Sequence, residues 1–146
     1  MAIVKKACLL QLAIPLAVLL GNIPLAHGAA RVLAVGVNES FTKDLEPLKF
    51  AASDAERFAN AMKIVGLVPT AETTLLANPK LEEFRTVLRQ LSSQPALPGS
   101  GRSKFVFYFS GHSDEDGLHF RDGLFPKQEL HQTLGRLAAH TKLSLI

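Results

Sequence analysis

The chain has 146 residues and a formal net charge of +3, and 47% of its residues are hydrophobic. This length suits one domain with a modest apolar core. The low charge, without a basic patch interleaved with aromatic residues, gives no indication of nucleic-acid binding. The sequence contains a single cysteine, Cys8, which excludes an intrachain disulfide and a thiolate zinc site.

Residues 1–28 show the pattern of a secretory signal peptide. Lys5 and Lys6 form a positive amino-terminal region, and residues 7–20 form an apolar run. The stretch ends in Ala-His-Gly, which places small residues where a signal peptidase cleaves. We therefore expect a cleavable leader on a secreted or periplasmic protein.

An uncleaved membrane anchor is the alternative interpretation of this segment. The apolar run is short for a membrane span and is interrupted by Pro15. Removal of the leader would also remove Cys8 and leave residues 29–146 nearly neutral, with no thiol. We therefore expect one domain at 29–146, with no stable membrane anchor after cleavage.

The first half of this domain predicts a strand followed by a helix. Residues 31–38 are rich in β-branched and apolar residues and end in a glycine and an asparagine, which predicts a buried strand. Ser53 and Glu56 form an S-x-x-E capping box, which predicts the start of a helix after a polar loop. Gly66 is expected to end this helix. Its apolar side chains share one helical face: Ala51, Ala55, Phe58 and Met62.

A second strand and helix follow, and then a third strand. Residues 73–78 predict the strand, and Asn78 is expected to cap a helix that begins at Pro79. The apolar stripe of this helix consists of Leu81, Phe84, Leu88 and Leu91. A connector rich in proline, glycine and serine, residues 92–103, leads to residues 104–109. That run is apolar on both alternating faces, which predicts a central strand of a parallel sheet.

The last part of the sequence completes an alternating α/β pattern. Two Asp-Gly pairs in residues 116–123 predict a β-hairpin. Pro126 opens a third helix with an inward leucine stripe, and residues 142–146 begin a fourth strand. The order β-α-β-α-β-hairpin-α-β predicts a three-layer α/β/α fold with a mostly parallel sheet. In such folds, functional residues gather at the carboxyl ends of the strands.

His112 lies at one of these carboxyl ends, directly after Gly111 in a turn. A neutral histidine there can act as a general base and as a general acid toward a leaving amine. The alternative is a packed or surface histidine without catalytic function.

A short segment around this histidine carries several metal-ligating residue types: His112, Asp114, Glu115, Asp116 and His119. Nitrogen and oxygen ligands of this kind suit a divalent ion. The spacing matches neither H-E-x-x-H nor a calcium loop, so we expect no metal. A metal-dependent hydrolase that uses His112, Asp114 and His119 stays as a weaker alternative.

Other catalytic motifs are missing from the sequence. There is no G-x-S-x-G elbow, no P-loop and no G-x-G-x-x-G turn, so neither a nucleophilic serine nor a nucleotide cofactor has support. Asp54 invites comparison with a receiver phosphoacceptor, but its place in the capping box favours stabilisation of the helix dipole. We expect no cofactor.

Three stretches resemble the caspase-like cysteine peptidases, the clan of caspases, metacaspases and bacterial caspase-domain proteins. Residues 31–38 resemble the first strand of that family, and residues 48–62 are similar to its first helix, where an Asp-Ala pair is typical. Residues 104–113 closely resemble its hydrophobic strand ending in Ser-Gly-His. The resemblance covers residues 31–146. It implies the larger-subunit half of a secreted, bacterial cysteine endopeptidase that acts on peptides or proteins.

The resemblance also implies roles for three residues. His112 would be the base and acid partner of a thiolate, and Gly111 would set its turn. Ser113 replaces the usual glycine and would offer its backbone N–H to an oxyanion hole.

The nucleophile of that family is a cysteine that follows the fourth strand in an Asp-x-Cys turn. The sequence stops at Ile146, within the predicted fourth strand, and contains no such cysteine. We therefore expect a partial chain, truncated in that strand and inactive as written. A non-catalytic caspase-fold interaction module, dimeric or bound to a partner, is the alternative.

Overall fold

The computed structural model describes residues 30–65, 72–95, 103–139 and 141–146. The predicted leader and the predicted helix end at Gly66 lie outside these ranges. Within them, no helix has the length and apolar character needed to cross a bilayer. The elements are β1 (Ala30–Gly36), α1 (Ala51–Ile64), β2 (Thr73–Ala77), α2 (Leu81–Ser93), β3 (Lys104–Ser110), β4 (Gly117–Phe120), β5 (Gly123–Pro126), α3 (Lys127–Ala138) and β6 (Lys142–Leu145).

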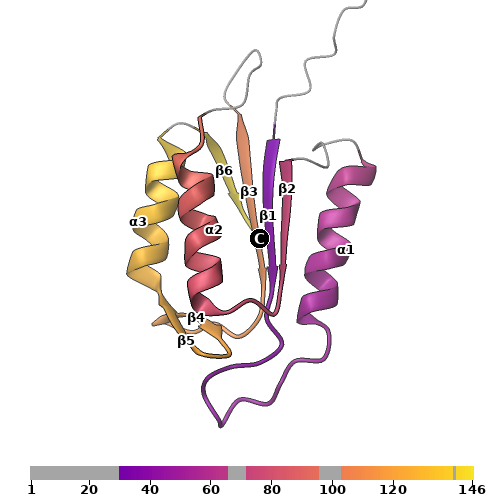
Figure 1. The fold of residues 1–146 in the computed structure, drawn as a ribbon, viewed down its shortest axis with the longest axis vertical. Coiled ribbons are helices and arrows are strands. Elements are labelled where there is room, and N and C mark those ends of the chain that lie inside the picture. Colours follow the sequence, from indigo (N-terminus) through magenta and orange to yellow (C-terminus); the bar gives the residue numbers. More distant parts are fainter. Residues whose placement is uncertain (1–29, 66–71, 96–102, 140) are drawn as a thin grey trace, which may run out of the picture.

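The predicted three-layer α/β/α fold is confirmed. Four parallel strands form one sheet in the order β2-β1-β3-β6, and β4 and β5 form a separate antiparallel hairpin. Helix α1 covers one face of the sheet, and α2 and α3 cover the other (Figure 1). β1 and β3 are the two central strands, as expected for runs that are apolar on both faces.

The face under α2 and α3 is built from large side chains around Phe84. The ring of Phe84 lies 6.1 Å from that of Phe107 on β3, measured between centroids. The rings of Phe120 and Phe125 each lie 4.9 Å from it, one stacked and one edge-on. Since Phe120 and Phe125 belong to the hairpin, this cluster fixes β4 and β5 beneath α2.

Where it packs on β1, the face under α1 is built from small side chains, while Phe58 of the helix stacks on Tyr108 of β3. Val32 and Ala34 of β1 pack against Ala55 and Ala59 of the helix. Small residues let the helix approach the sheet closely. A Cβ atom added to Gly36 would lie 2.3 Å from the carbonyl oxygen of Ala51, so β1 ends directly against the start of α1.

The predicted capping box at Ser53 is wrong. The helix begins at Ala51, and the Ser53 hydroxyl, already inside the first turn, donates to the carbonyl of Phe50 at 2.9 Å. The backbone N–H of Ala52 instead donates to Oδ1 of Asn38 at 2.8 Å. A side chain at the end of β1 therefore caps the helix, because close packing brings that strand end to the helix start.

The predicted cap at Asn78 is also wrong. Helix α2 begins at Leu81, and the Leu81 N–H donates to Oδ1 of Asp122, in the hairpin turn, at 2.9 Å. Asn78 instead continues the strand end, with its N–H donating to the carbonyl of Gly36 at 2.7 Å. Its φ of 50° lies in the left-handed region, which asparagine tolerates better than most residues.

Candidate active site

His112 lies at the carboxyl edge of the sheet, just beyond β3. The carbonyl of Ser110, the last residue of that strand, accepts a hydrogen bond from the N–H of Val37 at 2.8 Å. A Cβ atom at Gly111 would lie 2.7 Å from Cζ of Phe109. Glycine therefore fits this turn without displacing the Phe109 ring, which folds back against it.

The ring of His112 is held by a backbone carbonyl. Its Nε2 lies 2.9 Å from the carbonyl oxygen of Glu46. A carbonyl oxygen only accepts hydrogen bonds, so Nε2 carries the proton, and the lone pair of the neutral ring is on Nδ1. No described residue bonds to Nδ1. This arrangement leaves one ring nitrogen ready to take up a proton.

Glu46 belongs to the loop of residues 37–50, which joins β1 to α1. Asn38 holds the neck of this loop with three polar groups. Its carbonyl accepts from the N–H of Leu48 at 2.7 Å, and its N–H donates to Oδ1 of Asn78 at 2.8 Å. Its side-chain oxygen caps α1 through Ala52. The carbonyl that orients His112 therefore sits on a loop fixed at its base.

Ser113 forms an isolated antiparallel bridge with Leu118. The bridge consists of two hydrogen bonds, from His119 N to the carbonyl of His112 at 3.0 Å and from Asp114 N to the carbonyl of Gly117 at 3.1 Å. These bonds flank Ser113 and do not use its own N–H. Ser113 also has no positive φ, so serine fits here as well as glycine. Among the described residues, no hydrogen bond from its own N–H is found.

The residues considered for metal binding do not form a metal site. Nε2 of His119 is 2.7 Å from Oδ2 of Asp114, while His112 is turned toward the Glu46 carbonyl. The hydrogen bond from His119 lowers the pKa of the Asp114 carboxyl. In the part of the chain that the structure describes, no three His, Cys, Asp or Glu side chains are grouped to hold an ion.

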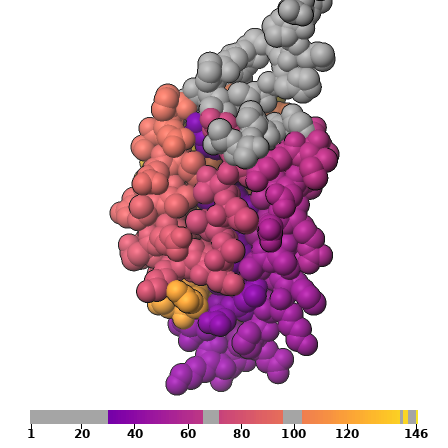
Figure 2. Space-filling model, turned by 45° about the vertical axis from the view of Figure 1, so that its right-hand side comes forward, coloured from indigo at the N-terminus to yellow at the C-terminus, as the bar shows by residue number. Residues whose placement is uncertain are grey.

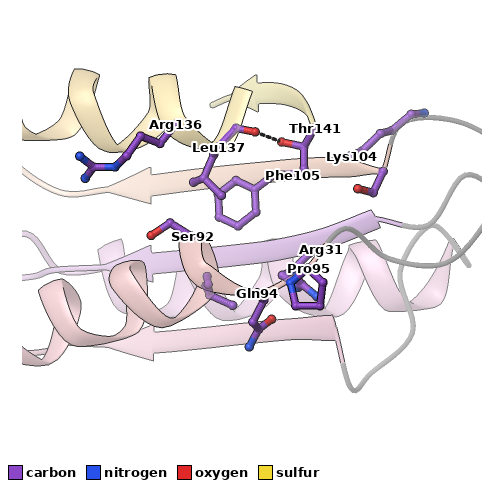
Figure 3. A pocket seen from close by; sticks show the side chains of 11 residues that line it. Arg31, Ser92, Gln94, Pro95, Lys104, Phe105, Arg136, Leu137 and Thr141 are labelled. Carbon is purple, nitrogen blue, oxygen red and sulfur yellow. Dashed lines mark hydrogen bonds between the residues drawn. The ribbon is translucent and has the colours of Figure 1, made fainter. Parts of the chain in front are cut away.

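Two cavities differ in their relation to the site. One is lined by Val37, Glu39, Asn78 and Arg121, which places opposite charges at the carboxyl edge. The other lies at the opposite edge, around Phe105, where the strands begin (Figure 3). Thr141, on its rim, donates to the carbonyl of Leu137 at 2.7 Å. The second cavity is therefore separate from His112.

The sequence pattern places His112, Gly111 and Ser113 together but gives little sign of the residues that hold them. The carbonyl of Glu46 is 66 residues away in sequence, and any residue type could supply it. Asn38 could have been singled out, because it is a polar residue just beyond the carboxyl end of β1, where functional side chains gather in such folds.

Comparison with protein families agrees with this architecture. Residues 31–143 match the family model described as the caspase domain, which is more than half of the chain. A comparison with curated proteins gives no match. With the parallel sheet, the hairpin after β3 and the Ser-Gly-His strand end in place, the chain belongs to the caspase domain family.

Proposed function

We propose that this protein is a cysteine-type endopeptidase in which His112 transfers the proton. The observation that carries the proposal is the 2.9 Å hydrogen bond from Nε2 to the Glu46 carbonyl, within a caspase domain. This bond fixes the tautomer and points the basic nitrogen, Nδ1, away from the loop. The bond thereby prepares the ring for general base catalysis.

The chemistry follows from these positions. Nδ1 takes the proton of a cysteine thiol, and the thiolate attacks the carbonyl carbon of the substrate peptide bond. The N–H of Ser113 stabilises the resulting oxyanion. Nδ1 then gives its proton to the leaving amine, and water hydrolyses the thioester with His112 again acting as base.

The proposal needs a thiolate beside Nδ1, and residues 31–146 contain no cysteine. Strand β6 indicates where one would fit. Ile146 N donates to the carbonyl of Phe107, and Phe109 N donates to the carbonyl of Ile146, both at 3.0 Å. Any residues that follow Ile146 would thus emerge at the same edge as His112.

The decisive experiment reads the source locus through the codon for Ile146 and assays the complete product. We expect an open frame containing an early cysteine, and hydrolysis of a denatured protein substrate that iodoacetamide blocks. His112→Ala should abolish hydrolysis, whereas His131→Ala, on the exposed side of α3, should not. A stop codon directly after Ile146 would contradict the proposal.

A non-catalytic interaction module is the second candidate. Three large apolar side chains on the loop beside His112 are exposed: Phe41 by 45%, Leu45 by 36% and Phe50 by 63%. Exposed apolar side chains gathered on one loop are typical of protein contacts. A module of this kind would be dimeric or partner-bound in light scattering, and Phe50→Ser would dissociate it.

Export is proposed on the residue pattern alone. Residues 1–28 have the charged, apolar and small-residue regions of a cleavable leader. Amino-terminal sequencing of the protein from the producing cells tests this. A mature chain that begins near residue 29 supports export, and an intact Met1 contradicts it.

A further inference from the structure

We propose that His119 is a positioning residue for His112, because it joins the two loops that set the orientation of the His112 ring. The first is the loop of residues 37–50, which carries the Glu46 carbonyl. The second is the segment 111–116, which carries His112 itself. This inference rests on the function proposed for His112.

The imidazole of His119 uses both ring nitrogens on these two loops. Nε2 bonds to Oδ2 of Asp114 at 2.7 Å, close after His112 in the chain. Nδ1 bonds to the hydroxyl of Ser40 at 3.0 Å, and the hydroxyl of Thr42 lies 3.4 Å away. His119 is only 5% exposed, whereas the Asp114 side chain reaches solvent, so the imidazole itself is held in a buried position.

Three further contacts hold the same junction together. The ring of Phe41 stacks on that of His119, with 5.2 Å between centroids. The N–H of Phe41 donates to the carbonyl of Phe120 at 2.9 Å, and the N–H of His119 donates to the carbonyl of His112 at 3.0 Å. Figure 2 shows the orange hairpin beside the indigo-to-purple loop at the lower end of the molecule. His119 therefore lies at the contact between the hairpin and the loop.

The hydrogen-bond pattern fixes the state of the His119 ring. The Asp114 carboxylate accepts from Nε2–H, which leaves Nδ1 as an acceptor in the neutral ring. The hydroxyl of Ser40 donates to Nδ1 while its oxygen accepts from the N–H of Thr42 at 3.1 Å. Every hydrogen-bonding position of the ring is thus occupied.

The same facts argue against a second catalytic triad made of Ser40, His119 and Asp114. The Ser40 oxygen already accepts a backbone N–H, and Phe41 covers the imidazole. The cavities at the carboxyl edge and around Phe105 are not lined by His119. These contacts favour a role in which the network acts through position.

The consequence for His112 is geometric. Its ring orientation depends on the distance between its own backbone and the Glu46 carbonyl, which belong to different loops. His119 spans those loops with side-chain bonds on each. Without the imidazole bonds, the loops can separate, and the His112 ring loses the bond that fixes its tautomer.

The test uses histidine side-chain NMR on the ¹⁵N-labelled protein, free of substrate. His119→Phe keeps the ring stack with Phe41 and removes both side-chain bonds. We expect the wild-type His112 ring to show one tautomer, protonated at Nε2, and the variant to show a tautomer mixture. Amide exchange at Leu48 should accelerate by about tenfold, the effect of losing one to two hydrogen bonds.

Controls separate positioning from general destabilisation. Leu91→Ala removes a buried side chain near the opposite edge and should leave the His112 signals unchanged, even where it lowers the melting temperature. If His119→Phe does not fold, Ser40→Ala and Asp114→Asn remove one bond each and should both broaden the tautomer distribution. A folded His119→Phe protein, or the two single variants, with a wild-type His112 spectrum would overturn the inference. Because this readout needs no nucleophile, absence of peptidase activity would count against the proposed function alone.

Discussion

The two faces of the sheet are packed by different means. Under α2 and α3, four phenylalanine rings form a thick aromatic layer with Phe84 at its centre. Under α1, alanines of the helix pack with Val32 and Ala34 of β1, and Gly36 lies directly against the Ala51 backbone. The large rings on the face under α2 and α3, the bulky face, hold the hairpin through its phenylalanines. The small side chains on the face under α1, the thin face, let the start of that helix lie against the end of β1.

This difference shows how one edge of the sheet acquires its site. On the thin face, proximity lets Asn38 cap α1 and close the loop that carries Glu46. On the bulky face, aromatic packing places the hairpin so that Asp122 caps α2. His119 then connects the hairpin to the loop. The candidate site therefore lies where the loop of residues 37–50 and the hairpin meet.

Breaking the aromatic face should have the largest effect. Phe84→Ala removes the central ring, leaves a cavity and should lower the free energy of unfolding by about 3–5 kcal/mol. The hairpin should lose protection from amide exchange before the α1 face does. Urea denaturation with site-resolved exchange measures both. Equal loss of protection on the two faces would show that they are not distinct units.

Breaking the thin face should cost somewhat less. Gly36→Ala places a Cβ atom 2.3 Å from the Ala51 carbonyl, a backbone atom that cannot move without the helix. We expect about 3 kcal/mol of destabilisation, the upper end of the usual range for overpacking. The matched control is Gly135→Ala on α3, where an added Cβ meets no atom within 4 Å and the change should stabilise slightly.

The two remote caps provide a matched pair. Asn38→Ala and Asp122→Ala each remove one side-chain acceptor from a helix start, which typically costs about 1 kcal/mol. Asn38→Ala should cost more, because Asn38 is half-buried whereas Asp122 is exposed. Chemical denaturation of both variants measures the difference. An equal cost would show that the burial of Asn38 adds nothing to its cap.

The smallest expected effect is the change in stability at acidic pH that the Asp114 carboxyl causes, where His119 of the hairpin bonds to it. The pKa of Asp114 lies below its ordinary value of 3.8 because His119 donates to the carboxylate. A carboxyl with a lowered folded pKa stabilises the fold above its unfolded pKa, and this contribution is lost as the pH falls through the folded pKa. The difference in melting temperature between wild type and Asp114→Asn should therefore be largest near pH 7 and shrink below pH 3.8. A difference that grows on acidification would contradict this assignment.

Much of the fold follows from local pattern. The spacing of Phe84, Leu88 and Leu91 predicted the buried side of α2, and all three are buried. The run of residues 104–109, apolar on both faces, predicted a central strand, and β3 lies between β1 and β6. These predictions succeed because side-chain periods of 3.6 and 2 are properties of the backbone itself.

The capping predictions failed for the opposite reason. Ser53 and Asn78 satisfy the local rules for helix starts, yet acceptors at Asn38 and Asp122, 14 and 41 residues from the N–H groups they bind, take that role. A local cap contributes little free energy to the position of a helix start. The packing of a whole helix against a strand end contributes more and therefore decides where the helix begins.

The sequence by itself determined the order of the elements, the buried face of each helix and the histidine that follows β3, His112. The tertiary structure alone decided what that histidine bonds to and which loops hold it. The Glu46 carbonyl, and the bond between Ser40 and His119 across 79 residues, leave no periodic or local trace in the sequence. Such contacts exist only after apolar burial has brought the carboxyl ends of the strands together.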